Sequence, residues 1–185
     1  MVTPNCTAAP TAAQQRAAVT LVNQTVRAAA RYRSLAVAKA AGYRPITPTG
    51  ARVVHYINPS VYLQGKTLDP ASIPVLVYVN TSHGAVLAAA MYLMPLASSA
   101  RPPQPGGCLT EWHVHTNLCF GTGGVVGTTS LSGCPAGSVN RQTPPMMHVW
   151  MIPVPGGPLT PDPSALSEVV AASRVPALAH PNGTA

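Results

Sequence analysis

Residues 11–41, TAAQQRAAVTLVNQTVRAAARYRSLAVAKAA, form the stretch that decides the fold. This stretch is rich in Ala, contains no Gly or Pro, and repeats its apolar residues about every 3.6 positions. Thr11 followed by Gln14 matches a capping box at its start, while Gly42 and Pro45 mark its end. The pattern predicts one long helix or two stacked helices.

Beyond Pro45 the apolar period changes to 2, and short runs of Val, Ile and Tyr alternate with Pro, Gly and Asn. This pattern is typical of strands joined by turns, and a tight turn is expected at 80–84. We predict strands at 52–57, 73–79, 85–94, 109–116 and 146–152. A helix packed on a mostly antiparallel sheet, or on a small barrel or sandwich, gives an α+β fold.

The domain organisation follows from length and composition. A chain of 185 residues with 46% hydrophobic residues is sufficient for one domain with its own core. We expect that single α+β domain over 11–175, with a disordered segment at 1–10 and a flexible tail at 176–185. Within the domain, the β-rich region spans 50–158, and a short helix spans 162–173.

Two stretches rich in Gly and Pro or in small polar residues interrupt the strand pattern, at 97–107 and 121–143. We expect them to be ordered mainly by their ends. The second is a candidate lid or flap.

The four cysteines lack the Cys-x-x-Cys spacing of zinc knuckles and thioredoxin-like sites, which favours disulfides over metal ligands. Proximity and loop length suggest the pairs Cys119–Cys134 and Cys6–Cys108, one of three connectivities. Metal ligation by some of them is the alternative. Disulfides are typical of exported proteins, so we expect a secreted or cell-surface protein. Because the first residues lack a signal-peptide pattern, the sequence would be its mature part or an excised ectodomain with an added Met.

The charge distribution allows an anionic surface or a protein as partner. The net charge is +7, with only four acidic residues. Basic residues concentrate on the predicted helix, which would otherwise simply present a solvated face. They are Arg16, Arg27, Arg31, Arg33 and Lys39. No nucleic-acid-binding module is recognisable, and no apolar run reaches the length of a transmembrane segment, so we expect neither nucleic-acid binding nor a membrane span.

The segment Glu111-Trp112-His113-Val114-His115 carries the most specific chemistry in the chain. In a strand, residues two apart point to the same side, so Glu111, His113 and His115 would project together. Two imidazoles and one carboxylate are the ligands of many iron sites and some zinc sites. The segment predicts a metal site, with a hydrogen-bonded polar cluster as the alternative.

Two more histidines, His55 and His148, lie in apolar segments that are predicted to be strands. A buried histidine must satisfy both ring nitrogens through hydrogen bonds or a metal. If the strands are neighbours, these two side chains converge with His113 and His115. His83 in a turn and His180 near the end of the chain are expected to be solvated.

Three functions remain open at this stage. The first is binding of a divalent or transition metal, zinc or copper before iron or manganese, for sequestration, sensing or handling. The second is a metal-dependent enzyme with one open coordination position and Glu111 as general base. The third is a metal-free interaction module that uses the basic helix. Several methionines lie near the histidines in the sequence, and their thioethers make copper a candidate metal, although packing is their usual role. They are Met91, Met94, Met146, Met147 and Met151.

A His-x-His pair on a strand, followed by a later strand histidine, resembles the metal motif of the cupin superfamily. Gly107, six positions before His113, and Gly121 also fit that motif. The glutamate expected after His115 is absent, so Glu111 would take its place. The resemblance implies a small β-barrel that holds a divalent metal.

Several blocks also resemble a family of small bacterial, notably actinobacterial, extracytoplasmic proteins of unassigned activity. The resemblance implies that the histidine-bearing strands form one site, and it implies no reaction. The blocks are His55-Tyr56-Ile57-Asn58-Pro59, Met91-Tyr92-Leu93, Trp112-His113-Val114-His115 with Asn117-Leu118-Cys119-Phe120, and Met147-His148-Val149-Trp150.

Overall fold

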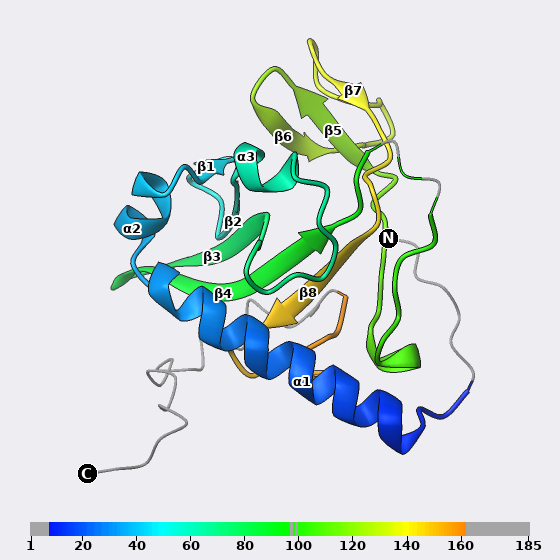
Figure 1. Ribbon diagram of the computed structural model, residues 1–185. Coiled ribbons are helices and arrows are strands. Elements are labelled where there is room, and N and C mark those ends of the chain that lie inside the picture. The colour runs from blue at the N-terminus through cyan, green and yellow to red at the C-terminus, as the bar shows by residue number, and fades with distance from the viewer. Residues whose placement is uncertain (1–7, 97, 99, 162–185) are drawn as a thin grey trace.

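The computed structural model describes residues 8–96, 98 and 100–161. A long N-terminal helix runs along a large sheet, and a smaller sheet lies on the side of the molecule remote from that helix (Figure 1). The α+β class predicted from the sequence is therefore confirmed.

The helices and strands have the following bounds. The helices are α1 (Ala12–Ala29), the 3-10 helix η1 (Ala30–Tyr32), α2 (Leu35–Ala40), α3 (Pro59–Tyr62) and the 3-10 helix η2 (Gly107–Leu109). The strands are β1 (Arg44–Pro45), β2 (Val53–Ile57), β3 (Val75–Thr81), β4 (Gly84–Leu93), β5 (Leu118–Gly121), β6 (Gly124–Thr128), β7 (Val139–Asn140) and β8 (Met146–Trp150). The predicted strands at 52–57, 73–79, 85–94 and 146–152 correspond to β2, β3, β4 and β8.

The strands form two antiparallel sheets, a large one in the order β1-β2-β3-β4-β8 and a small one in the order β6-β5-β7. Over the described ranges they do not form the single closed barrel that the cupin resemblance implies. Backbone hydrogen bonds nevertheless connect β6 of the small sheet to the residue after β1, and the segment after η2 to β8. Val125 N–H donates to the Ile46 carbonyl over 2.8 Å, and Met146 N–H donates to the His113 carbonyl over 2.8 Å.

The N-terminal helical region follows its capping signals. Thr11 and Gln14 form the predicted capping box, with their reciprocal hydrogen bonds at 2.8 and 3.2 Å. Ser34 has extended backbone, which separates α2 from the preceding helical turns. Gly42, at φ 95°, ends α2 in a Schellman motif, in which Tyr43 N–H donates to the Ala38 carbonyl. The second of the two predicted arrangements, two successive helices, is the one observed.

The large sheet has two buried faces. The helix face is the side that packs on α1 and α2, and it carries Leu76, Tyr78, Tyr92 and Val149. The histidine face is the opposite side, which carries His55 and His148. Apolar side chains that share this second face form their own cluster, which includes Val75, Val77, Ala89, Met91, Leu93, Met146 and Trp150. Because β3 lies between the two layers, almost all of its residues are apolar.

The predicted strand at 109–116 is wrong. The chain forms η2 there and then pairs with β8 only through an isolated bridge between His113 and Met146. Antiparallel pairing in the register of that bridge would place Pro144 opposite His115 and Trp150 opposite Leu109. Pro144 has no N–H to donate, and Trp150 N–H donates to the Pro158 carbonyl at 2.7 Å, so the ladder extends in neither direction.

The prediction that 121–143 is ordered only by its ends is also wrong, since β6 and β7 lie within it. The predicted disulfide Cys119–Cys134 is present and ties β5 to this segment. Its small polar residues gave little strand signal. Some predictions fall on residues outside the described ones. They are the helix at 162–173, the tail at 176–185 and His180. The predicted pair Cys6–Cys108 is among them because Cys6 lies outside the described residues.

Candidate metal centre

His55 and His148 meet on the histidine face although two strands separate them. Neighbouring strands are about 4.8 Å apart, so β2 and β8 would be about 14 Å apart in a flat sheet. The two ring centroids are only 6.1 Å apart. The large sheet is therefore curled toward the histidine face, and this curl makes the site.

His113 and His115 reach the same place from the segment that follows η2. The bridge to Met146 positions His113, and Thr143 Oγ1 accepts the N–H of His115 at 2.9 Å. The His113 ring stacks on that of His148 with centroids 5.1 Å apart, and it lies 5.2 Å from the His115 ring. The structure thus brings the four imidazoles together, although the condition attached to the prediction, neighbouring strands, does not hold: β3 and β4 separate β2 from β8.

The hydrogen bonding of the rings is incomplete. His113 is 1% exposed, and neither of its ring nitrogens has a hydrogen-bond partner in the part of the chain that the structure describes. His55 Nδ1 is likewise buried without a partner. A polar group left in this state costs about 1–3 kcal/mol. The cluster is therefore not the satisfied hydrogen-bond network that the alternative interpretation of the sequence required.

His148 is the most firmly positioned of the four. Its Nδ1 lies 2.8 Å from the Pro161 carbonyl oxygen, and its ring stacks between His113 and Trp150. A carbonyl can only accept, so Nδ1 carries the proton in the neutral ring. The lone pair of Nε2 is then available to a metal, an arrangement common among metal-binding histidines.

The electrostatics keep the rings neutral. Burial, and to a smaller extent His115, lowers the pKa of His113 to about 3 and that of His55 to about 4. Burial lowers the pKa of His148 well below 6.5, and His55 and His113 add to the effect. Neutral imidazole is the form that binds a metal.

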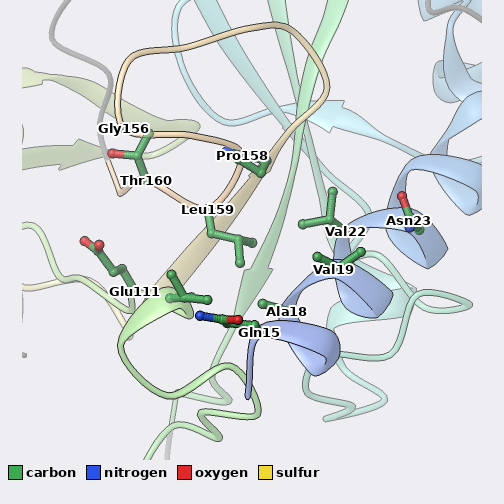
Figure 2. Close-up of a pocket in the computed structure, with 11 residues that line it drawn as sticks. Gln15, Ala18, Val19, Val22, Asn23, Glu111, Gly156, Pro158, Leu159 and Thr160 are labelled. Atoms are coloured by element: carbon green, nitrogen blue, oxygen red, sulfur yellow. The ribbon is translucent and has the colours of Figure 1, made fainter. Parts of the chain in front are cut away.

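Glu111 does not join the histidines. Because 109–116 is not a strand, the alternation of sides does not extend back to Glu111, whose side chain is exposed. It borders a separate cavity of about 360 Å³ beside α1, across from Val19 and Val22 (Figure 2). Trp112, the next residue, is buried and donates its Nε1–H to the Pro103 carbonyl at 2.8 Å. The predicted place of Glu111 in the site is therefore wrong.

The present ring orientations do not form a ready set of ligands. Within the described residues, no three His, Cys, Asp or Glu side chains are arranged to hold a metal ion. The His113 and His148 rings are nearly parallel, at 19°, so they present faces to each other instead of nitrogen lone pairs. Metal binding at this cluster requires rotation of at least one ring.

A second cavity, of about 240 Å³, adjoins the histidines. It lies between the histidine face and the small sheet, and both His55 and His115 border it. Thr47 and Thr143 also border it, and each accepts the backbone N–H of one of these histidines at 2.9 Å. Sequence reasoning missed both threonines, as well as Pro161 and Trp150, because no local pattern marks a residue that supports another across the fold.

The remaining predicted features are placed as follows. All five basic residues of the predicted helical region have exposed side chains. Two of them lie over aromatic rings, Arg31 over Tyr32 and Lys39 over Tyr56. His83 is exposed in the β3–β4 turn, as predicted. The described helices include none with the length and hydropathy needed to cross a bilayer.

Comparisons of the chain with protein-family models, curated proteins and solved structures gave no match.

Proposed function

We propose that this protein binds one transition-metal ion, zinc or copper, through a cluster of four histidines: His55, His113, His115 and His148. The observation that carries the proposal is His113, which is buried with both ring nitrogens unpartnered beside three other imidazoles. Leaving a buried nitrogen without a partner costs about 1–3 kcal/mol. The free energy of metal binding is far larger than this cost, so a metal bond more than offsets it.

His148 supports the proposal independently. Its Nδ1–H donates to the Pro161 carbonyl, which fixes the tautomer. The lone pair on Nε2 is therefore available as a metal ligand. We assign it the role of the preorganised ligand, with His113 as the ligand that turns to join it. The χ2 torsion of histidine is broad and roughly two-fold, so this rotation is inexpensive.

The choice of metal follows from the donors. Imidazole nitrogens suit zinc and copper, whereas magnesium, calcium and manganese favour carboxylate and carbonyl oxygens. No carboxylate of the described residues lies with the histidines, which makes iron or manganese the weaker candidates. Met91 and Met146 border the adjoining cavity, and their thioethers keep copper(I) in consideration beside zinc.

The biological role we propose is sequestration, sensing or handling of this metal outside the cytoplasm. The Cys119–Cys134 disulfide supports that location, since such bonds persist in oxidising compartments. Glu111 has no part in the proposal, because it borders the other cavity. General-base catalysis by Glu111 at this metal is therefore not proposed.

The test uses protein stripped with a chelator and then reconstituted with zinc or copper(II). We expect one metal ion per chain by elemental analysis. His113→Gln and His148→Gln should each weaken binding by about 100-fold or more, because each removes a direct ligand. His83→Ala is the matched control, since it removes an exposed histidine from a turn. Absence of bound metal in the reconstituted parent, or equal affinity in the histidine variants and the parent, would overturn the proposal.

A further inference from the structure

The cavity between the histidine face and the small sheet has the chemistry of a ligand site. Its volume is about 240 Å³. An apolar protein cavity of about 150 Å³ accommodates benzene, so this one has room for a single ring with a small substituent. It is larger than an ordinary packing void and too small to hold a peptide.

The walls of the cavity are mostly apolar and carry no formal charge. Leu93 and Met91 contribute from the histidine face, and Phe120 and Val125 contribute from the small sheet. Among the described residues, no Lys, Arg, Asp or Glu borders it. A charged ligand would lose its hydration without gaining a partner from the protein, which selects for a neutral molecule.

The polar groups of the cavity come in two pairs. Thr47 accepts the N–H of His55, and Thr143 accepts the N–H of His115. Each hydroxyl oxygen thus uses one lone pair for the backbone, while its own proton has no acceptor among the described residues and can be donated to a ligand oxygen. Polar groups of this kind orient a ligand in an otherwise apolar site.

The small sheet holds the outer wall in place. The β5–β6 hairpin places Phe120 and Val125 opposite each other in register, and Val125 N–H is hydrogen-bonded to the Ile46 carbonyl. Gly124, at φ 127°, is so close to Ile46 that a Cβ would overlap the Ile46 backbone. This close approach, together with the positive φ, explains the glycine and holds β6 against Ile46, which also borders the cavity.

We infer that this cavity binds a small neutral aromatic molecule that bears a hydroxyl group, of the phenol class. The ring contacts Phe120 and the methionine thioethers, which interact favourably with aromatic edges. The hydroxyl, as both donor and acceptor, meets the threonine and imidazole groups. The inference goes beyond the proposed metal binding and does not require that a metal be bound.

The experiment follows 4-fluorophenol by ¹⁹F NMR, with the full chain in zinc-loaded and chelator-treated forms. We expect saturable binding in at least one form. In the chelator-treated protein, 4-fluorobenzoate should bind at least about tenfold more weakly, because no cation borders the cavity. Absence of saturable 4-fluorophenol binding in both forms would overturn the inference.

Variants locate the site. Leu118→Trp and Val125→Phe each fill the cavity and should weaken 4-fluorophenol binding at least about tenfold. Leu131→Trp is the control, because this side chain is fully exposed. Circular dichroism tests whether each variant is folded. If Leu118→Trp does not fold, Val125→Phe, which is the smaller change, provides the test. Unchanged binding in a folded cavity-filling variant would contradict the inference.

Zinc affinity, measured on the same samples, separates the two proposals. Binding of 4-fluorophenol without zinc binding supports the cavity and rejects the metal site. Zinc binding without 4-fluorophenol binding does the opposite.

Discussion

The two faces of the large sheet differ in how completely their buried polar groups are hydrogen-bonded. On the helix face, the Tyr43 and Tyr92 hydroxyls are satisfied, by the Ile73 carbonyl and by Thr25 Oγ1 at 2.7 and 2.8 Å. On the histidine face, three ring nitrogens of His55 and His113 are buried without partners. The buried hydroxyls of the helix face are therefore hydrogen-bonded, whereas the histidine face keeps buried polar atoms without partners. The histidine face is where we expect a ligand to bind.

The largest expected difference between the faces is the response to acid. Folding keeps His55, His113 and His148 neutral, with pKa values below 6.5. Below pH 6.5 the unfolded state therefore binds more protons than the folded state, so stability falls as the pH falls. For metal-free protein we expect a loss on the order of several kcal/mol between about pH 6.5 and pH 4.

Urea unfolding at several pH values, in the presence of a chelator, measures this loss. The chain has only four acidic residues, so carboxylates contribute little to the profile. A stability that is constant from pH 7 to pH 4.5 would refute the account of the histidine face.

On the helix face, Leu76→Ala should destabilise the protein by about 2–5 kcal/mol, because it leaves a cavity in the core. The affinity for zinc, measured at a temperature where the variant is folded, should stay within about twofold of the parent. A large loss of affinity would mean that the two faces are not separable.

The opposite experiment is His113→Phe on the histidine face. It replaces a buried ring whose nitrogens lack partners with an apolar ring of similar shape, so the metal-free protein should gain about 1 kcal/mol or more. The same variant should lose the metal. If urea unfolding finds the variant less stable than the metal-free parent, His113 has a structural role that this account omits.

The smallest effect is expected from Tyr92→Phe, which removes the hydroxyl that bonds to Thr25 on α1. The loss of one buried hydrogen bond should cost about 1 kcal/mol of unfolding free energy. Zinc affinity and the acid response should match the parent. A change in either would connect the helix to the metal site.

Much of the large sheet and its helix could be predicted from the sequence. The apolar pattern located α1, β2, β3, β4 and β8, because α1 is long and periodic and each strand is an apolar run bounded by Pro, Gly or polar residues. The Thr11 and Gly42 signals located the helix ends for the same local reasons. The apolar neighbours of His55 and His148 placed both on predicted strands, while their convergence was predicted only for strands lying side by side.

What the sequence could not supply is long-range. The curl that brings His55 to His148 depends on the whole sheet. The predicted role of Glu111 depended on a strand at 109–116, but Pro144 cannot pair on one side of the His113–Met146 bridge, and Pro158 takes the N–H of Trp150 on the other. The small sheet was missed because its strands have only 4, 5 and 2 residues and glycines interrupt β5 and β6. Its disulfide was found by cysteine spacing alone.

The central claim is tested most directly by X-ray absorption spectroscopy of the zinc-loaded protein at one ion per chain. The account predicts three or four imidazole nitrogens at about 2.0–2.1 Å from zinc, and loss of at least one of them in His113→Gln. A spectrum of oxygen ligands without imidazole scattering, unchanged in that variant, would contradict it.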